Sequence, residues 1–312
     1  MMGKPRIAVV GCGAIGSLVA AQLVEHDYEV VVYGRGAHVR ALREMGLRVT
    51  GKWACTVAPQ SFHAVILDDD DDGAEGIDPS LRGSCAQAII TEKAKDTARL
   101  AEVAAFLSPV VLSLQNGLGN LEHVERVVGS ENAAVGITTN AVTRSGPGEI
   151  SWVGRGTVQV GGPMASSFVP TLCCLGAEVV QDVEALLWHK LLLNVAINPL
   201  AAILGVTNGG LLEASLFQRA QGAMLEAALV ARALGIGIDD DETLVKRLRW
   251  MMELSAENVC SMLADVRHGR ETEIDSLCGQ VVLRGEKVGV PTPINAKLVS
   301  QVRALTFGVE KV

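Results

Sequence analysis

Short apolar runs rich in β-branched residues recur through the first half of the chain. Residues 7–10 form one such run, and residues 29–33 form the next. Runs without polar alternation are typical of strands buried on both faces of a parallel sheet. Further runs of this kind are interleaved with helical or polar segments and occupy residues 86–90, 109–114, 134–137 and 157–160. The pattern predicts an α/β fold, in which the more alternating residues 48–67 add a hairpin or edge strands.

The character of the chain changes after about residue 183. Apolar residues now follow helical spacing in long stretches, at 185–204, 211–234, 240–257 and 272–287. In the last stretch, Ile274, Leu277, Cys278, Val281 and Val282 form one apolar stripe, so that helix should pack inward. We therefore expect two domains, a Rossmann-type doubly wound sheet over residues 1–183 and an all-helical domain over residues 184–312.

A glycine-rich turn follows the first predicted strand at once and precedes a helical pattern over residues 17–23. It reads Gly11-Cys12-Gly13-Ala14-Ile15-Gly16. In a dinucleotide fingerprint the first glycine allows the tight turn, the second admits the pyrophosphate, and the third lets helix and strand pack closely. Alternatives are a turn without a ligand, or a site for FAD or S-adenosylmethionine. The strand-turn-helix-strand context favours a nicotinamide dinucleotide held by residues 11–16.

The end of the second predicted strand indicates which dinucleotide is bound. Enzymes selective for NAD usually carry an acidic residue there, whereas this chain reads Tyr33-Gly34-Arg35. A guanidinium can fork onto a 2′-phosphate, so Arg35 predicts NADP(H), and Lys93 could add a second positive charge. Either cation could instead only decorate a loop.

Asn116 follows another predicted strand, at the carboxyl edge where open α/β sheets bind their ligands. We therefore expect it to contact the bound coenzyme. Asn-Gly is also an ordinary turn signal, which is the alternative interpretation.

Lys190, Asn194 and Asn198 lie four residues apart within an otherwise apolar stretch. On a helix they would form one polar stripe, and buried polar groups without partners cost several kcal/mol. The lysine could reach solvent by snorkelling, with the amides bonded to nearby backbone. The stripe otherwise predicts a catalytic acid in a cleft.

A second polar segment, residues 258–275, lies between apolar helices near the end of the chain. Glu273 directly precedes the apolar stripe that begins at Ile274, so its carboxylate should be half-buried and in need of a cation. Lys190 is the candidate. Glu273 could instead be a first-turn partner of the helix dipole, with Thr272 as the cap.

Composition narrows the class of protein. The formal charge of −8 comes mostly from seven acids in residues 68–78, a segment that we expect to be solvated, and no basic cluster attracts nucleic acid. Seven cysteines form no C-x-x-C pair, which disfavours a disulfide framework or a metal site and fits a reducing compartment. Without a signal-peptide pattern or an apolar run of about 18 residues, we expect a soluble, cytoplasmic protein that does not bind a membrane. Its apolar helical faces allow a homodimer.

Taken together and in order, these motifs resemble the ketopantoate reductase (2-dehydropantoate 2-reductase) family over nearly the whole chain. Besides the glycine turn, the resemblance rests on Asn116-Gly-x-Gly, Lys190-x3-Asn194-x3-Asn198, Ser261-Met-Leu-x-Asp265, Arg270-x-Thr-Glu273-Ile-Asp275 and Pro291-Thr-Pro. It implies NADPH-dependent reduction of 2-dehydropantoate to (R)-pantoate, in the pantothenate pathway, with the nicotinamide in a cleft between the two domains.

The resemblance also implies roles for single residues. Lys190 would donate a proton to the ketone oxygen, and Glu273 would orient the substrate. Ser261 and Asn258 would hold the substrate carboxylate, and the polar wall would be completed by Asn116, Asn194 and Asn208. Two departures leave the substrate open: Trp152 stands where the family usually has histidine, and the acidic segment 68–78 is unusual. Alternatives are a reductase or dehydrogenase of another 2-oxo acid or of an opine-like substrate, or a catalytically silent NADP-binding sensor.

Overall fold

The chain forms two compact units in a computed structural model that describes residues 5–68, 73–92 and 96–307. The first, here the sheet unit, comprises the chain up to Gln115 together with Asn120–Val183. The second, the helical unit, comprises the chain from Glu184 onward together with Asn116–Gly119. The short segment 116–119 thus departs from the continuous division expected from the sequence. It packs with the helical unit, where Gly117 lies so close to Ser276 that an added Cβ would stand 2.3 Å from its carbonyl oxygen.

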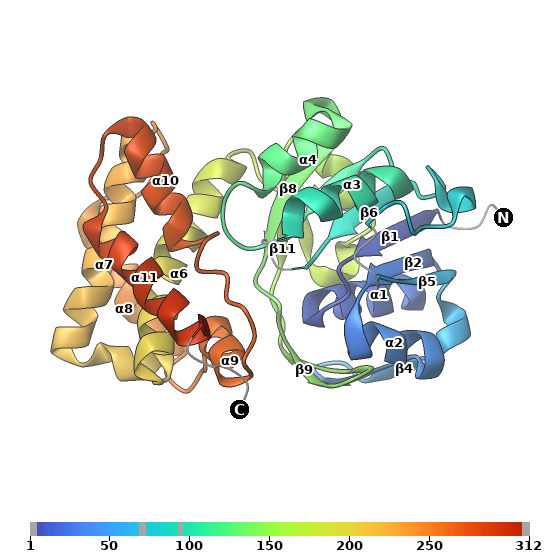
Figure 1. Cartoon of the computed structure of the whole chain (residues 1–312), viewed down its shortest axis with the longest axis horizontal. Helices are drawn as coiled ribbons and strands as arrows, with labels where there is room; N and C mark the ends of the chain where they lie inside the picture. Colours follow the sequence, from blue (N-terminus) through green and yellow to red (C-terminus); the bar gives the residue numbers. More distant parts are fainter. Residues whose placement is uncertain (1–4, 69–72, 93–95, 308–312) are drawn as a thin grey trace. The chain divides into compact units, whose positions relative to one another are not determined.

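A large, mostly parallel sheet forms the centre of the sheet unit (Figure 1). Within the described residues its strands run in the order β12 (Ala177–Val179), β11 (Val158–Gly161), β8 (Ala133–Thr138), β7 (Val111–Ser113), β6 (Gln87–Ile90), β1 (Arg6–Val10), β2 (Glu29–Gly34) and β5 (Ala64–Leu67). Only the β8–β11 pairing is antiparallel. The strand order reverses at β1, so the predicted Rossmann-type fold is confirmed.

Both faces of this sheet are covered, because successive strand residues point to opposite sides. On one face, Ile7 and Val9 of β1 share a core with α1 (Ala14–Glu25) and α2 (Gly36–Met45). On the other face, Ala8 and Val10 share a core with α3 (Thr97–Leu107) and α4 (Asn120–Val128). Burial on both sides explains why these strands read as continuous apolar runs.

A second, smaller sheet packs into the core that contains α1. Its order is β4 (Cys55–Val57), β3 (Leu47–Gly51), β10 (Glu149–Gly154) and β9 (Ala141–Gly146). The expected hairpin is β3–β4 and the expected edge strand is β5, so both predictions for residues 48–67 are confirmed. The β9–β10 hairpin was not predicted, since half of its positions are polar or exposed.

Short elements complete the connections of the sheet unit. They are η1 (Pro59–Ser61), η2 (Pro79–Leu81), η4 (Ser130–Asn132), α5 (Ala165–Phe168) and η5 (Cys173–Leu175). Within the acidic segment 68–78, residues 69–72 lie outside the described part of the chain. Two of its other acids have structural contacts: the buried Asp68 pairs with Arg99 at 2.5 Å, and Asp78 accepts a hydrogen bond from the Ser80 amide at the start of η2. These two carboxylates therefore make structural contacts and are not merely solvated.

The helical unit packs around one long apolar helix, α6 (Val183–Leu204). The other elements are η6 (Asn208–Leu212), α7 (Ala214–Ala233), α8 (Asp241–Leu254), α9 (Ser261–Arg267), α10 (Cys278–Val288) and α11 (Pro293–Phe307). Helix α6 is long and apolar enough to cross a membrane, but more than half of its most apolar window is buried in this unit, and the core helix of a soluble protein passes the same test.

Two details of the helical unit differ from the sequence prediction. The helix expected over 272–287 begins only at Cys278, because residues 273–277 form turns in which the Glu273 carbonyl accepts from the amides of Ser276 and Leu277. The interpretation of Glu273 as a first-turn residue capped by Thr272 is therefore wrong. Helix α11 was not predicted: its N-terminal amides, Ile294 and Asn295, are capped by Glu226 of α7, which no local sequence signal reveals.

Candidate active site and coenzyme-binding loop

The three glycines of the fingerprint differ in what surrounds them. Gly11 has a φ of +89°, and an added Cβ would stand 2.2 Å from the Cβ of Glu92. At Gly16 the added atom would stand 2.4 Å from Thr91 Oγ1. At Gly13 it would meet nothing within 4 Å among the described residues. Packing therefore explains the first and third glycines, whereas the second leaves open space of the kind that a ligand needs.

Helix α1 begins directly behind this open space. Gly13 is its N-cap residue, and no side-chain hydrogen bond caps the helix among the described residues. Gly13, Ala14 and Ile15 are partly exposed, so the first backbone amides of α1 can face a pyrophosphate. The Cys12 side chain is buried in the core, where burial raises the pKa of its thiol to about 12, so this residue offers only its backbone.

A buried histidine contacts the first turn of α1. His38 of α2 places Nε2 2.8 Å from the hydroxyl of Ser17, in the first turn of α1, and accepts a hydrogen bond of 3.1 Å from the amide of Gly148. Burial lowers the pKa of His38, so its ring stays neutral. This contact joins residues far apart in the chain, so no local sequence pattern predicts it.

Arg35 follows β2 directly and is partly exposed, and no carboxylate stands at the last position of that strand. Its guanidinium forms an ion pair with Asp96, at the start of α3. Asp96 was not predicted as a site residue, since the local sequence shows it only as an acid just before the helix that follows β6. Lys93, the second predicted cation, lies outside the described residues.

Lys190 and Glu273 both belong to the helical unit, and the charge of Glu273 acts on the Lys190 ammonium although 83 positions of sequence separate them. Lys190 projects from α6 and is partly buried, and Glu273 lies in the turn before α10. The Asn116 amide donates a hydrogen bond of 3.3 Å to Glu273 Oε2. Three elements distant in sequence thus bring an ammonium, a carboxylate and an amide together.

The local environment changes the acidity of Lys190. Burial lowers the pKa of its ammonium to about 8, and the negative charge of Glu273 opposes that shift. A lysine with this pKa is still mostly protonated at neutral pH but gives up its proton readily. It suits general acid catalysis, for which a pKa near the working pH is optimal.

The rest of the predicted stripe continues along α6. Asn194 and Asn198 are partly exposed, and no hydrogen bond of either side-chain amide is found within residues 5–68, 73–92 and 96–307. The stripe from Lys190 to Asn198 spans about 12 Å, given the rise of an α-helix.

The segment before α9 contacts the end of this stripe at Asn198. The Cys260 thiol lies 3.7 Å from the carbonyl oxygen of Asn198 and accepts from the amide of Leu263. Its neighbours Asn258 and Ser261 are exposed. Asn208 is different: it is buried, its amide donates to Ser255 at 2.9 Å, and its backbone amide donates to the carbonyl of Asn258. Asn208 is thus placed to support the loop of Asn258.

Trp152, the departure noted in the sequence, belongs to the core of the sheet unit. It is only 3% exposed, and its indole NH donates to the carbonyl of Gly154 at 2.9 Å. The side chain therefore has no free polar group to offer a substrate.

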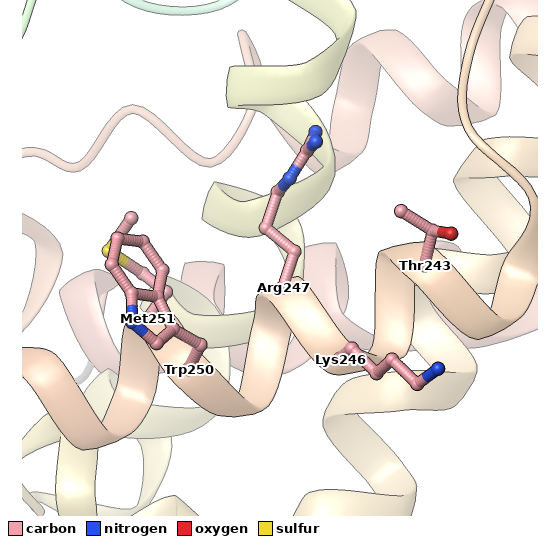
Figure 2. A pocket seen from close by; sticks show the side chains of 5 residues that line it. All are labelled: Thr243, Lys246, Arg247, Trp250 and Met251. Atoms are coloured by element: carbon pink, nitrogen blue, oxygen red, sulfur yellow. The ribbon is translucent and has the colours of Figure 1, made fainter.

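A pocket on α8 contains none of the predicted site residues. Figure 2 shows its lining side chains, Thr243, Lys246, Arg247, Trp250 and Met251, all of which project from this one helix. Arg247 is engaged by Asp239 at 2.8 Å. We do not assign this hollow to the reaction.

Comparison with known proteins agrees with the sequence resemblance. The family model described as ketopantoate reductase PanE/ApbA matches residues 7–163, and that of its C-terminal part matches residues 182–306. A 2-dehydropantoate 2-reductase of Archaeoglobus fulgidus is 31% identical, in an alignment that covers 99% of this chain and 100% of the relative.

Solved structures agree as well. A PanE/ApbA family ketopantoate reductase from Ralstonia eutropha is 27% identical with a TM-score of 0.84, covering 97% of this chain and 99% of that one. A D-mandelate dehydrogenase solved with NADH and anilino(oxo)acetate has a TM-score of 0.87 and 24% identity, covers 97% of this chain and 98% of that one, and shows a shared fold alone.

The family model extends over both units, and the fold and the whole-chain relative agree with it. The resemblance drawn from the sequence motifs is confirmed: this chain belongs to the ketopantoate reductase PanE/ApbA family and is an oxidoreductase that depends on a nicotinamide dinucleotide.

Proposed function

We propose that this enzyme reduces 2-dehydropantoate to (R)-pantoate with NADPH, and that Lys190 is its general acid. The observation that carries the proposal is the partly buried Lys190 beside Glu273, with a pKa lowered to about 8. The sheet unit would bind NADP(H), through residues 11–16 and Arg35. The helical unit would bind the 2-oxo acid. We further propose that the enzyme acts in the cytoplasm, without nucleic acid or membrane partners, and that it can form a homodimer.

The chemistry follows from the charges in the site. The bound coenzyme supplies a hydride to the carbonyl carbon, which leaves negative charge on the carbonyl oxygen. Lys190 Nζ donates its proton to that oxygen and becomes a neutral amine, which solvent reprotonates. A positioned acid of this kind typically contributes about 10²- to 10⁴-fold to the rate.

The remaining polar groups would position the substrate. Glu273, held by Asn116, would accept a hydrogen bond from a substrate hydroxyl, and the carboxylate of the substrate would lie near Ser261 and Asn258. Asn194 would donate to the substrate between these two ends. Asn116 would also touch the coenzyme. Asn208, buried under the Asn258 loop, fits a supporting role better than direct contact.

A panel of 2-oxo acids tests the substrate. We expect 2-dehydropantoate to give the highest kcat/KM, by at least about tenfold over acids that lack its 4-hydroxyl, because a site built to bind a hydroxyl is left with unpaired polar groups when it is absent. The assay follows loss of NADPH absorbance. A higher kcat/KM for another 2-oxo acid or for an opine-forming pair would favour that activity, and no turnover with any acid would favour a binding-only protein.

The pH dependence of reduction should report Lys190. Its protonated form is the acid, so the rate of the chemical step should fall about tenfold per pH unit above a pKa near 8. The reverse oxidation needs the neutral amine and should rise through the same pKa. Because Glu273 raises the pKa of Lys190, Glu273→Gln should move the falling limb to lower pH. If the rate of reduction stayed constant between about pH 7 and about pH 10, Lys190 would not be the proton donor.

A further inference from the structure

The ion pair between Arg35 and Asp96 joins two segments at the edge of the sheet where we expect the coenzyme to bind. Arg35 follows β2, whereas Asp96 precedes α3 and comes after β6. In the sheet, β1 lies between β2 and β6, and the glycine turn begins where β1 ends. The pair therefore lies at the carboxyl edge of the sheet, where the strand order reverses and dinucleotides bind.

Both members of the pair are open to an exchange of partners. The side chain of Arg35 is 39% exposed and that of Asp96 is 23% exposed. The Asp96 side chain makes no hydrogen bond that caps α3, although it stands at the N-cap position. Its carboxylate is instead paired with the guanidinium of Arg35.

Asp96 carries the same sign of charge as a 2′-phosphate and already engages the cation expected to bind that phosphate. An approaching NADPH must share the guanidinium with the carboxylate and lie near its negative charge. NADH carries a 2′-hydroxyl instead, which can donate to a carboxylate. The guanidinium has five N–H donors, so the competition weakens phosphate binding without abolishing it.

We propose that Asp96 is a specificity-determining residue of the coenzyme site. By holding Arg35, its carboxylate lowers the preference for NADPH over NADH below what Arg35 alone would set. This inference rests on the proposed function, specifically on coenzyme binding by the sheet unit. Arg35 favours NADPH and Asp96 opposes that preference, so the two residues together set the ratio of the affinities for NADPH and NADH.

The test is a comparison of Kd values for NADP⁺ and NAD⁺, measured by titration calorimetry on the full chain without a 2-oxo acid. Asp96→Asn keeps the side-chain size and removes the charge, and we expect it to raise the preference for NADP⁺ by about two- to fivefold, as for the loss of one competing charge at a partly exposed site. Arg35→Ala should change the preference in the opposite direction. Glu102→Gln is the matched control, since it removes an exposed carboxylate from the same helix and should leave the ratio unchanged.

Each outcome decides one point. A preference that shifts toward NADP⁺ in Asp96→Asn, and not in Glu102→Gln, supports the inference. If both Kd values change by the same factor, the role of Asp96 is merely structural and the inference is overturned. It is overturned likewise if neither Kd value changes. A wild-type chain that binds neither dinucleotide would instead contradict the proposed function itself, before any variant is compared.

Discussion

Lys190→Met is expected to lower kcat for reduction by at least about 100-fold while changing coenzyme affinity by no more than about twofold. Methionine keeps the length and apolar stem of lysine but cannot donate a proton, so the negative charge that develops on the carbonyl oxygen loses its acid. The coenzyme loop lies in the other unit and should be unaffected. Steady-state kinetics with NADPH and 2-dehydropantoate, together with a coenzyme titration, measure both quantities.

Stability provides a second readout of the same substitution. The pKa of Lys190 is about 8 in the folded chain against an ordinary value of 10.5, so the unfolded chain binds more protons between these values. Stability should therefore rise as pH increases from 8 to 10.5, and below pH 8 the buried charge carries a constant cost, about 3 kcal/mol at most. Lys190→Met removes that cost, so at pH 7 the variant should be as stable as the wild type or more so.

Lys246→Met is the matched control, because Lys246 is an exposed lysine on α8 that pairs with Glu242. It should leave kcat unchanged. If Lys190→Met retained near-normal turnover, Lys190 would not be the acid, and if it unfolded, its partly buried ammonium would instead be part of a stabilising network.

Gly13→Ala is expected to weaken coenzyme binding by at least about tenfold without lowering the melting temperature of the free chain. The added methyl group meets nothing within 4 Å of the described protein, so it should clash only with a bound pyrophosphate. Gly11→Ala should behave differently. Its φ of +89° and the 2.2 Å approach to Glu92 predict a loss of stability of several kcal/mol in the free chain.

Thermal unfolding of the two variants without ligand, followed by coenzyme titration, separates a binding surface from a structural turn. Equal destabilisation of both variants would mean that the space beside Gly13 is not open in solution. A Gly13→Ala variant with unchanged affinity would place the pyrophosphate elsewhere.

Much of the sheet unit could be predicted from local patterns. Strands buried on both faces are continuous apolar runs, and the glycine turn after β1 carries a strict steric signature, so β1, β2, β6 and their neighbours were located within a few residues. The β9–β10 hairpin was missed because β9 is exposed at four of its six positions, so the apolar alternation of β10 has no counterpart in the strand that precedes it. The late start of α10 was missed because an apolar stripe at helical spacing begins inside the turns that precede it.

By itself, the sequence determined the fold class, the family and the residue types of the candidate site, because each depends on spacing along the chain: glycines at positions 11, 13 and 16, and polar residues at helical intervals on α6. Only the tertiary structure decided which charges meet. The approach of Glu273 to Lys190, its hydrogen bond from Asn116, and the pairing of Arg35 with Asp96 each join residues at least 61 positions apart. Such contacts depend on how helices and strands pack, and Coulomb interactions that shift a pKa act across space and leave no trace in local sequence.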